Sequence, residues 1–277
     1  MAGKSFECMT SKERVVAALT GQPYDRIPVF MLLSDQASRT INVTVGEYQN
    51  SAHLLAQGQL TAWREYGMDM INTGPGLTGI AEAAGSRLAF PDDTAYVVET
   101  AITKPEDLER LIIPDPLRQG RLPLFLEATE TVLREVGEQV LVSLTTAGPF
   151  TTASGLRGTE HLMRDLRRNP EFVHRLMRFS TDSTISFVTE VMKRGGRIGI
   201  AEPVASGTLI SRGQFQEFVL PYLKELITVI KNISGSAPSL HICGNSSRIW
   251  HDMVESGAGT LSLDDEVDRC LWLGCQQ

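Results

Sequence analysis

Short apolar runs alternate with longer amphipathic stretches along most of this chain. Six runs have the length of a strand and are bounded by glycine, proline or polar residues. They cover residues 26–33, 68–73, 139–145, 198–201, 239–243 and 260–263, with a shorter candidate at 270–274. Most of the stretches between them have helical periodicity. This alternation predicts an α/β fold, in which covering helices join the strands of a parallel sheet.

Local signals support several of the predicted helix boundaries. Thr10 and Glu13 have the spacing of a capping box, which predicts that a helix begins beside them. Pro170 follows an asparagine, and proline is favoured in the first turn of a helix. We therefore expect a long helix from this proline to about Arg194, where two glycines follow.

The length of the chain favours a (β/α)8 barrel over an open sheet. Such barrels typically need about 250 residues, and we expect residues 1–277 to form a single domain of this kind. No G-x-G-x-x-G motif follows a predicted strand, which argues against a dinucleotide-binding fold. The pattern provides at most seven strands, so the barrel is expected to be short by about one β/α unit at its C-terminal end.

Composition excludes several classes of function. The chain is 42% hydrophobic and 21% charged, with a formal net charge of -7 and a pI near 5.3. It has no basic run interleaved with aromatic residues, so nucleic acid is not an expected partner. No segment approaches the roughly 18 apolar residues of a membrane span, and residues 1–10 lack a signal-peptide core. Four cysteines in this length suggest a reducing, cytoplasmic setting rather than a disulfide framework.

Polar residues follow the predicted strands at the ends where barrel enzymes place their chemistry. Within one strand, alternate side chains share a face, so His241 and Cys243 should point the same way. An imidazole and a thiolate are typical zinc ligands. The other candidates at these ends are Asn72, Ser143, Thr145, Glu202, Asp264, Asp265 and Cys275. Their convergence on one mouth would make a zinc site more plausible than the His-x-Cys pair alone.

Each of these candidates also has a purely structural interpretation. The His-x-Cys pair could be a buried thiol beside a core imidazole. Glu202 precedes a proline and could cap a neighbouring helix. Asn72 lies close to a Gly-Pro turn, and the pair Asp264 and Asp265 could belong to a solvated turn. The sequence leaves these alternatives open.

Five different short stretches carry a resemblance to a known family, at residues 26–29, 66–69, 148–151, 205–211 and 241–245. No single stretch is diagnostic, but together and in this order they resemble the uroporphyrinogen decarboxylase superfamily. The resemblance extends over essentially the whole chain and implies a TIM-type barrel.

Two branches of this superfamily differ in their chemistry. The decarboxylases act on the acetate groups of a tetrapyrrole without a metal, and they carry an arginine-rich segment after the first strand. Here the corresponding segment has one arginine, Arg39, with the carboxylate of Asp35 nearby. The methylcobamide-dependent methyltransferases carry a His-x-Cys zinc pair in a late strand, which His241 and Cys243 match. The chain therefore resembles the corrinoid methyltransferases of the methylcobalamin:coenzyme M type.

This resemblance implies a zinc-dependent enzyme that moves a methyl group from a methylcobamide to a small-molecule acceptor, a thiol or similar group. His241 and Cys243 would be catalytic zinc ligands. Asn72, Glu202 and Asp264 would lie near the acceptor. The donor would be a free cobamide or one carried on a separate corrinoid protein.

The third zinc ligand is the point at which the sequence departs from the family pattern. In the family it is a cysteine after the last strand, and Cys275 is the candidate nearest to that position. Either the site is incomplete, or Cys275 or a partner supplies the ligand. Two alternatives therefore remain: a metal-free tetrapyrrole decarboxylase with Asp264 or Glu202 near a pyrrole, and a non-catalytic barrel that binds a cobamide or a partner.

Overall fold

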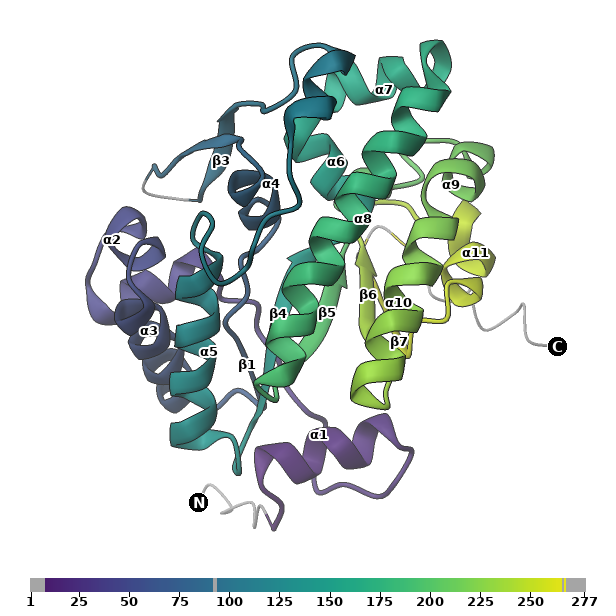
Figure 1. Ribbon diagram of the computed structural model, residues 1–277. Coiled ribbons are helices and arrows are strands. Elements are labelled where there is room, and N and C mark those ends of the chain that lie inside the picture. The colour runs from purple at the N-terminus through teal and green to yellow at the C-terminus, as the bar shows by residue number, and fades with distance from the viewer. Residues whose placement is uncertain (1–7, 92–93, 266, 268–277) are drawn as a thin grey trace, which may run out of the picture.

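The central feature of the computed structural model, which describes residues 8–91, 94–265 and 267, is a five-stranded parallel sheet (Figure 1). Its strand order is β1-β4-β5-β6-β7, so the five strands lie side by side in chain order, and β2 and β3 lie outside this sheet. The strands are β1 (Met70–Asn72), β4 (Leu141–Ala147), β5 (Arg197–Ala201), β6 (Ser239–Ile242) and β7 (Thr260–Leu263). A separate antiparallel hairpin is formed by β2 (Arg87–Ala89) and β3 (Tyr96–Glu99).

Helices cover one face of this sheet. Figure 1 shows the long helix α8 in front of β4 and β5, and α10 in front of β6 and β7. The α-helices are α1 (Ser11–Leu19), α2 (Val45–Gln49), α3 (Ala52–Tyr66), α4 (Gly79–Ala83), α5 (Leu122–Val136), α6 (Pro149–Arg157), α7 (Thr159–Arg168), α8 (Pro170–Lys193), α9 (Arg212–Phe218), α10 (Leu220–Ser234) and α11 (Trp250–Glu255). Short 3-10 helices are η1 (Asp35–Ile41), η2 (Pro105–Arg110), η3 (Pro203–Ala205) and η4 (Ser247–Ile249).

The two faces of the sheet differ in chemistry because side chains alternate along each strand. One face presents large apolar residues that are buried: Val142, Leu144, Ile198, Ile200, Leu240 and Ile242. The other presents small or polar residues: Ser143, Thr145, Gly199, Ser239 and His241. The apolar face packs against the helices. The polar face is therefore the inner, concave side on which chemistry is expected.

The predicted α/β class is confirmed, and the parallel sheet corresponds to part of a barrel that the described residues do not close. The expected strand over residues 26–33 is wrong. This segment is extended, but apart from one hydrogen bond from Asp69 N to Val29 O (2.7 Å) it has no ladder to β1. Ile27 is 74% and Leu32 57% exposed. An apolar run becomes a strand only when a neighbouring strand pairs with it. The candidate strand at 270–274 and Cys275 lie outside the described residues.

A buried ion cluster attaches α1 and the segment after it to the start of β1. The guanidinium of Arg14 is 1% exposed and donates to Asp25 (2.6 and 2.9 Å) and to Asp69 (2.6 Å). Arg26 and the backbone N–H of Val29 donate to the other Asp69 oxygen, at 2.6 and 2.7 Å. Two of the stretches that carry the family resemblance thus form a structural anchor rather than a catalytic group.

The predicted helix boundaries are confirmed where they were read from capping residues. Thr10 and Glu13 form a reciprocal capping box at the start of α1. Asn169 caps α8, which has Pro170 at its first position and ends at Lys193.

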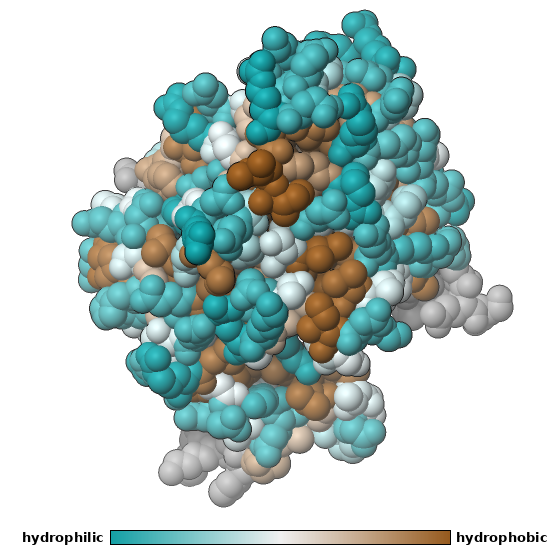
Figure 2. Space-filling model, in the orientation of Figure 1, coloured by the Kyte–Doolittle hydropathy of each residue, from teal (hydrophilic) through white to brown (hydrophobic). Residues whose placement is uncertain are grey.

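The molecular face in Figure 2 is mostly polar, with separate apolar patches. Among the described residues, no helix has the length and apolarity that crossing a membrane requires.

Candidate metal and active site

His241 and Cys243 meet at the carboxyl end of β6, on the inner face of the sheet. In the parallel register, His241 lies between Ala201 of β5 and Ser262 of β7. Its Nε2 is 3.2 Å from the Cys243 Sγ, and both side chains are partly exposed. Its Nδ1 faces the other way, 3.2 Å from the Ser262 carbonyl oxygen and 3.0 Å from the Ser262 hydroxyl. The two side chains are therefore close together and partly exposed, and Ser262 contacts the imidazole on the edge opposite Cys243.

The spacing of this pair fits a shared metal ion. Zn–N bonds of about 2.0 Å and Zn–S bonds of about 2.3 Å, at a tetrahedral angle, place the nitrogen and sulfur about 3.5 Å apart. The 3.2 Å between Nε2 and Sγ requires only a slight opening to reach that distance. In the described part of the chain, no group of three or more His, Cys, Asp or Glu residues could hold a metal. The predicted third ligand, Cys275, lies outside it.

The environment of Cys243 keeps its thiol protonated when no cation is present. Burial raises the pKa of the Cys243 thiol, and the negative charge of Asp264 raises it further. The S–H can then donate to the imidazole Nε2 at 3.2 Å. Such a thiol is a poor nucleophile, since the thiolate is the reactive form. Metal binding displaces the proton of a cysteine ligand, so this arrangement suits a ligand better than an attacking group.

The loop that carries Cys243 is held in place from two sides. Asp264 accepts a hydrogen bond from the backbone N–H of Gly244 (2.7 Å) and another from Asp265 N (2.7 Å). These bonds lower the pKa of Asp264, so the carboxylate is charged at neutral pH. Gly244 has φ +68°, and a Cβ there would lie 2.8 Å from the Ser206 hydroxyl. The turn after β6 therefore favours glycine at this position, where the backbone next to Cys243 lies against Ser206.

Glu202 lies beside this site, but its side chain caps a helix. It is fully buried, and its carboxylate oxygens accept hydrogen bonds from Phe150 N (2.9 Å) and Thr151 N (2.8 Å) in the first turn of α6. Gly148 immediately precedes this helix, and a Cβ there would lie 2.3 Å from a carboxylate oxygen of Glu202. The capping interpretation of Glu202 is confirmed. A contact with substrate stays a prediction, and the carboxylate has no exposed surface in this structure.

Burial gives Glu202 a measurable effect on stability. It raises the pKa of Glu202 to about 7, and the hydrogen bonds from α6 only partly oppose this. The folded state therefore holds the proton more tightly than the unfolded state. This contribution is fully present below about pH 4.5 and is lost as the pH rises through 7. At about 1.4 kcal/mol for each pH unit, it amounts to roughly 3 kcal/mol.

We therefore expect Glu202→Gln to lack this pH-dependent component of stability. Urea unfolding at pH 5 and pH 8 measures the difference between wild type and variant. The variant should lose one hydrogen bond at pH 5, about 1 kcal/mol, and should gain relative to wild type at pH 8. Glu127→Gln on the exposed side of α5 is the matched control. If the difference in unfolding free energy between wild type and Glu202→Gln were the same at pH 5 and pH 8, the assignment would be contradicted.

Asn72 lies away from the histidine–cysteine pair, and its amide is already engaged. Its side-chain oxygen accepts hydrogen bonds from Gly74 N (2.9 Å) and Thr145 N (3.2 Å), and its amide nitrogen donates to the Thr145 hydroxyl. Because β4 and β5 separate β1 from β6, Asn72 and His241 are about 14 Å apart across the strands, at about 4.8 Å per spacing, and the register offsets them further along the strands. The structure thus brings His241, Cys243 and Asp264 together, whereas Asn72 holds the β1–β4 end.

Ser262 is not among the site residues predicted from the sequence. It occupies the alternate position two residues before Asp264, on the face of β7 that neighbours His241. The alternation in 260–263 was a usable signal, because Ser262 shares a face with Asp264 if the strand continues. The sequence could not identify His241 as the partner of Ser262, because the register between β6 and β7 depends on how the two strands pair.

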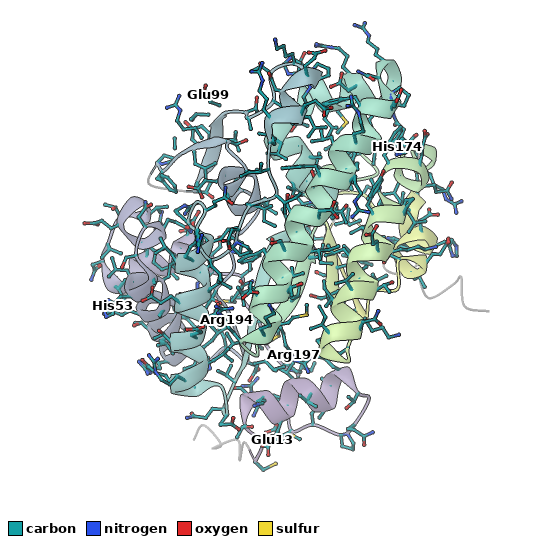
Figure 3. All side chains as sticks on the ribbon, in the orientation of Figure 1. Glu13, His53, Glu99, His174, Arg194 and Arg197 are labelled. Carbon is teal, nitrogen blue, oxygen red and sulfur yellow. The ribbon has the colours of Figure 1, made fainter. Side chains whose placement is uncertain are left out.

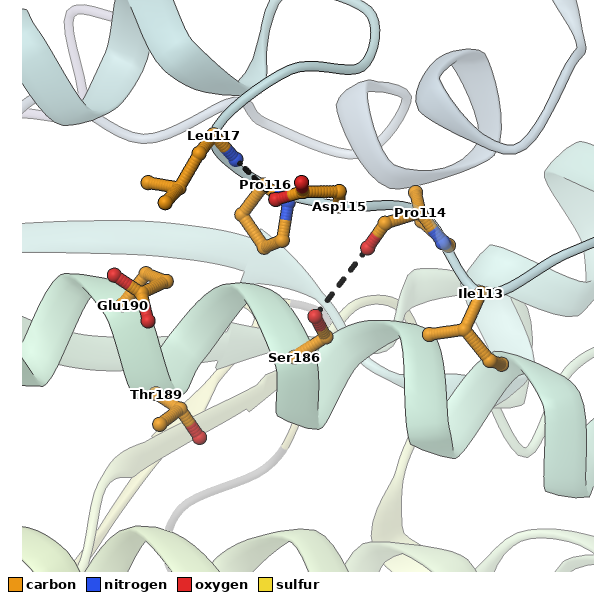
Figure 4. A pocket seen from close by; sticks show the side chains of 8 residues that line it. All are labelled: Ile113, Pro114, Asp115, Pro116, Leu117, Ser186, Thr189 and Glu190. Atoms are coloured by element: carbon orange, nitrogen blue, oxygen red, sulfur yellow. Dashed lines mark hydrogen bonds between the residues drawn. The ribbon is translucent and has the colours of Figure 1, made fainter.

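Other features of the molecule are less suitable as the site. Figure 3 shows His53 and His174 on outer helices. The His174 ring packs against Phe218, and its Nδ1 lies 3.0 Å from the Tyr222 hydroxyl, as expected for a packing residue. A surface hollow lies between the segment 113–117 and α8, where the Ser186 hydroxyl donates to the Pro114 carbonyl at 3.3 Å (Figure 4). None of the candidate residues lines this hollow.

Comparison with known proteins identifies relatives that cover most of the chain. Residues 10–272 match the family profile described as "Uroporphyrinogen decarboxylase (URO-D)". The methylcobamide:CoM methyltransferase MtaA of Methanosarcina barkeri is 27% identical over 263 residues, covering 93% of this chain and 76% of the relative. The uroporphyrinogen decarboxylase of Pseudomonas putida (strain W619) is 25% identical over 272 residues, covering 91% and 75%.

A solved structure shows the same relationship. A methyltransferase from Methanosarcina mazei superposes with a TM-score of 0.83 at 28% identity, covering 92% of this chain and 76% of the other. The expected superfamily and its methyltransferase branch are both confirmed, as is the expectation of an enzyme. The names of the relatives do not test the zinc ligands or the residues placed near the acceptor.

Proposed function

The chain belongs to the uroporphyrinogen decarboxylase family, and we propose that it is a zinc-dependent methyltransferase that moves a methyl group from a methylated corrinoid to a thiol. The observation that carries this proposal is the 3.2 Å pair of His241 Nε2 and Cys243 Sγ at the carboxyl end of β6. Its residue types, spacing and position fit a catalytic metal site. The methylcobamide:CoM methyltransferases among the relatives support the same donor and acceptor chemistry.

The proposed reaction balances without any further reagent. The acceptor thiol loses its proton to solvent, its sulfur bonds to the methyl carbon, and the cobalt–carbon bond breaks with its electron pair left on cobalt. Bound zinc would lower the pKa of the acceptor thiol, so that a thiolate is available at neutral pH. His241 and Cys243 would hold the ion, with Cys275 or a partner group as the further ligand.

The surrounding residues would position these groups. Asp264 fixes the loop of Cys243 through Gly244 N, and its charge stands beside the site. Glu202 caps α6, whose first turn follows β4 at the same end of the sheet. Because its carboxylate is buried, we propose that Glu202 shapes the mouth rather than contacting the acceptor. The cobamide, free or on a corrinoid protein, would approach the open inner face next to His241.

The decarboxylase alternative finds less support in the geometry. A carboxylate near a pyrrole must be accessible, whereas Glu202 is fully buried and both oxygens of Asp264 accept backbone hydrogen bonds. The described segment 33–39 contains one arginine, so it offers little charge for the several carboxylates of a tetrapyrrole. These features favour the methyltransferase.

The test combines metal analysis with two assays on the purified full chain. We expect about one zinc per chain and loss of methylcobalamin absorbance when coenzyme M, the thiol in the names of the relatives, is added. A chelator should abolish the turnover, and added zinc should restore it. Turnover of uroporphyrinogen by metal-free protein would contradict the proposal in favour of the decarboxylase. Absence of both zinc and turnover would contradict it in favour of a binding protein.

A further inference from the structure

We propose that Ser262 of β7 is a positioning residue that fixes the tautomer and orientation of His241, so that Nε2 is available to a metal. Its carbonyl oxygen and hydroxyl lie 3.2 and 3.0 Å from the imidazole Nδ1. This inference rests on the proposed zinc site. It adds a residue that the sequence pattern and the names of the relatives do not assign.

The carbonyl contact determines which nitrogen carries the proton. A backbone carbonyl oxygen only accepts hydrogen bonds, so the 3.2 Å contact is a hydrogen bond only when the proton is on Nδ1, and this contact favours that tautomer. In the neutral ring, Nε2 then has a free lone pair, and it faces Cys243 Sγ at 3.2 Å. The opposite tautomer would set the Nδ1 lone pair against the carbonyl oxygen of Ser262 and place a proton where the metal would bind.

The same strand holds both arms of the site. Ser262 pairs with His241 in the parallel register, and Asp264, two residues later, accepts from the N–H of Gly244 beside Cys243. The imidazole is thus fixed by Ser262 of β7, and the backbone next to Cys243 is fixed by Asp264, which directly follows this strand. Groups that orient metal ligands in this way commonly contribute 10–100-fold to metal affinity. The strand β7 therefore acts as a template for the distance between Nε2 and Sγ.

A merely structural serine would behave differently. Ser262 is exposed, so a hydroxyl that only solvated the imidazole edge could be replaced by water without effect on zinc affinity. Ser239 offers a matched control, since it is also exposed and lies on the same face of β6, two residues before His241. Ser262→Ala removes the hydroxyl and keeps the carbonyl, and Ser262→Thr keeps both.

Two measurements on the full chain test this role. In metal-free protein labelled with ¹⁵N-histidine, NMR should show the Nδ1–H tautomer for His241 in wild type and also in Ser262→Ala, because the variant keeps the carbonyl that accepts from Nδ1. In competition with a chromophoric chelator, Ser262→Ala should bind zinc roughly 10-fold more weakly. Ser262→Thr and Ser239→Ala should match wild type in both.

The outcomes separate this inference from the proposed function. An Nε2–H tautomer in the wild type, or Ser262→Ala that binds zinc as tightly as wild type, would overturn the role of Ser262. A wild-type protein that binds no zinc would instead overturn the proposed function. The tautomer measurement needs no metal, so it still tests the positioning of His241 in that case.

Discussion

Replacing His241 or Cys243 with alanine is expected to remove most of the bound zinc and to reduce methyl transfer by more than the roughly 10–100-fold that loss of a supporting group costs. Each substitution removes one of the two proposed ligands, whose Nε2 and Sγ atoms lie 3.2 Å apart. A site with one of them left has lost the chelating pair, and the other side chain cannot compensate from its position on the same strand. Zinc content by mass spectrometry and methylcobalamin turnover measure the two effects.

The controls make this expectation specific to the pair. Cys8 is a free, exposed thiol far from β6 in the chain, and Cys8→Ala should retain both zinc and activity. His174→Gln removes a partly exposed imidazole that packs against Phe218, and it should also retain zinc. Zinc at full stoichiometry in both His241→Ala and Cys243→Ala would show that the ion is held elsewhere.

Arg14→Met is expected to destabilise the protein by about 3 kcal/mol, the lower end of what breaking a buried ion pair costs. The variant leaves Asp69, which is 0% exposed, with less compensation for its charge. Burial alone would raise the pKa of Asp69, but the hydrogen bonds from Arg26, Val29 and Arg14 outweigh it and keep the pKa below its ordinary value. Urea unfolding at pH 7 measures the loss.

The pH dependence of this loss follows from the same bonds. The folded pKa values of Asp25 and Asp69 are lowered, Asp25 mainly by its hydrogen bond with Arg14. Their contribution is therefore present above the unfolded pKa near 4 and declines as the pH falls below it. The difference between wild type and Arg14→Met should be constant from pH 5 to 7 and smaller below pH 4.

Lys12→Met on the same helix is the matched control for Arg14. Its ammonium is 37% exposed, lies 3.8 Å from Glu138 and donates to the Gly137 carbonyl at 2.7 Å. Exposed pairs of this kind contribute about 0–1 kcal/mol. Equal effects of the two substitutions would mean that burial of the Arg14 cluster contributes nothing measurable.

Much of the fold could be predicted because its signals are local. Strand and helix periods, the capping box of Thr10 and Glu13, and the proline that opens α8 depend on neighbouring residues only. The prediction over 26–33 failed because apolar composition favours burial but does not provide a pairing partner. The same limit applies to Asn72, whose amide is engaged by Thr145, a residue 73 positions away in the chain.

By itself, the sequence determined the alternation of strands and helices, the common face of His241 and Cys243, and the family to which their motif belongs. Only the tertiary structure decided that Glu202 bonds to α6, that Ser262 contacts His241, and that Asp264 bonds to the backbone beside Cys243. The physical reason is that periodicity is a property of one segment, whereas a hydrogen-bond partner across the sheet depends on the register between segments. That register is set by the packing of the whole sheet.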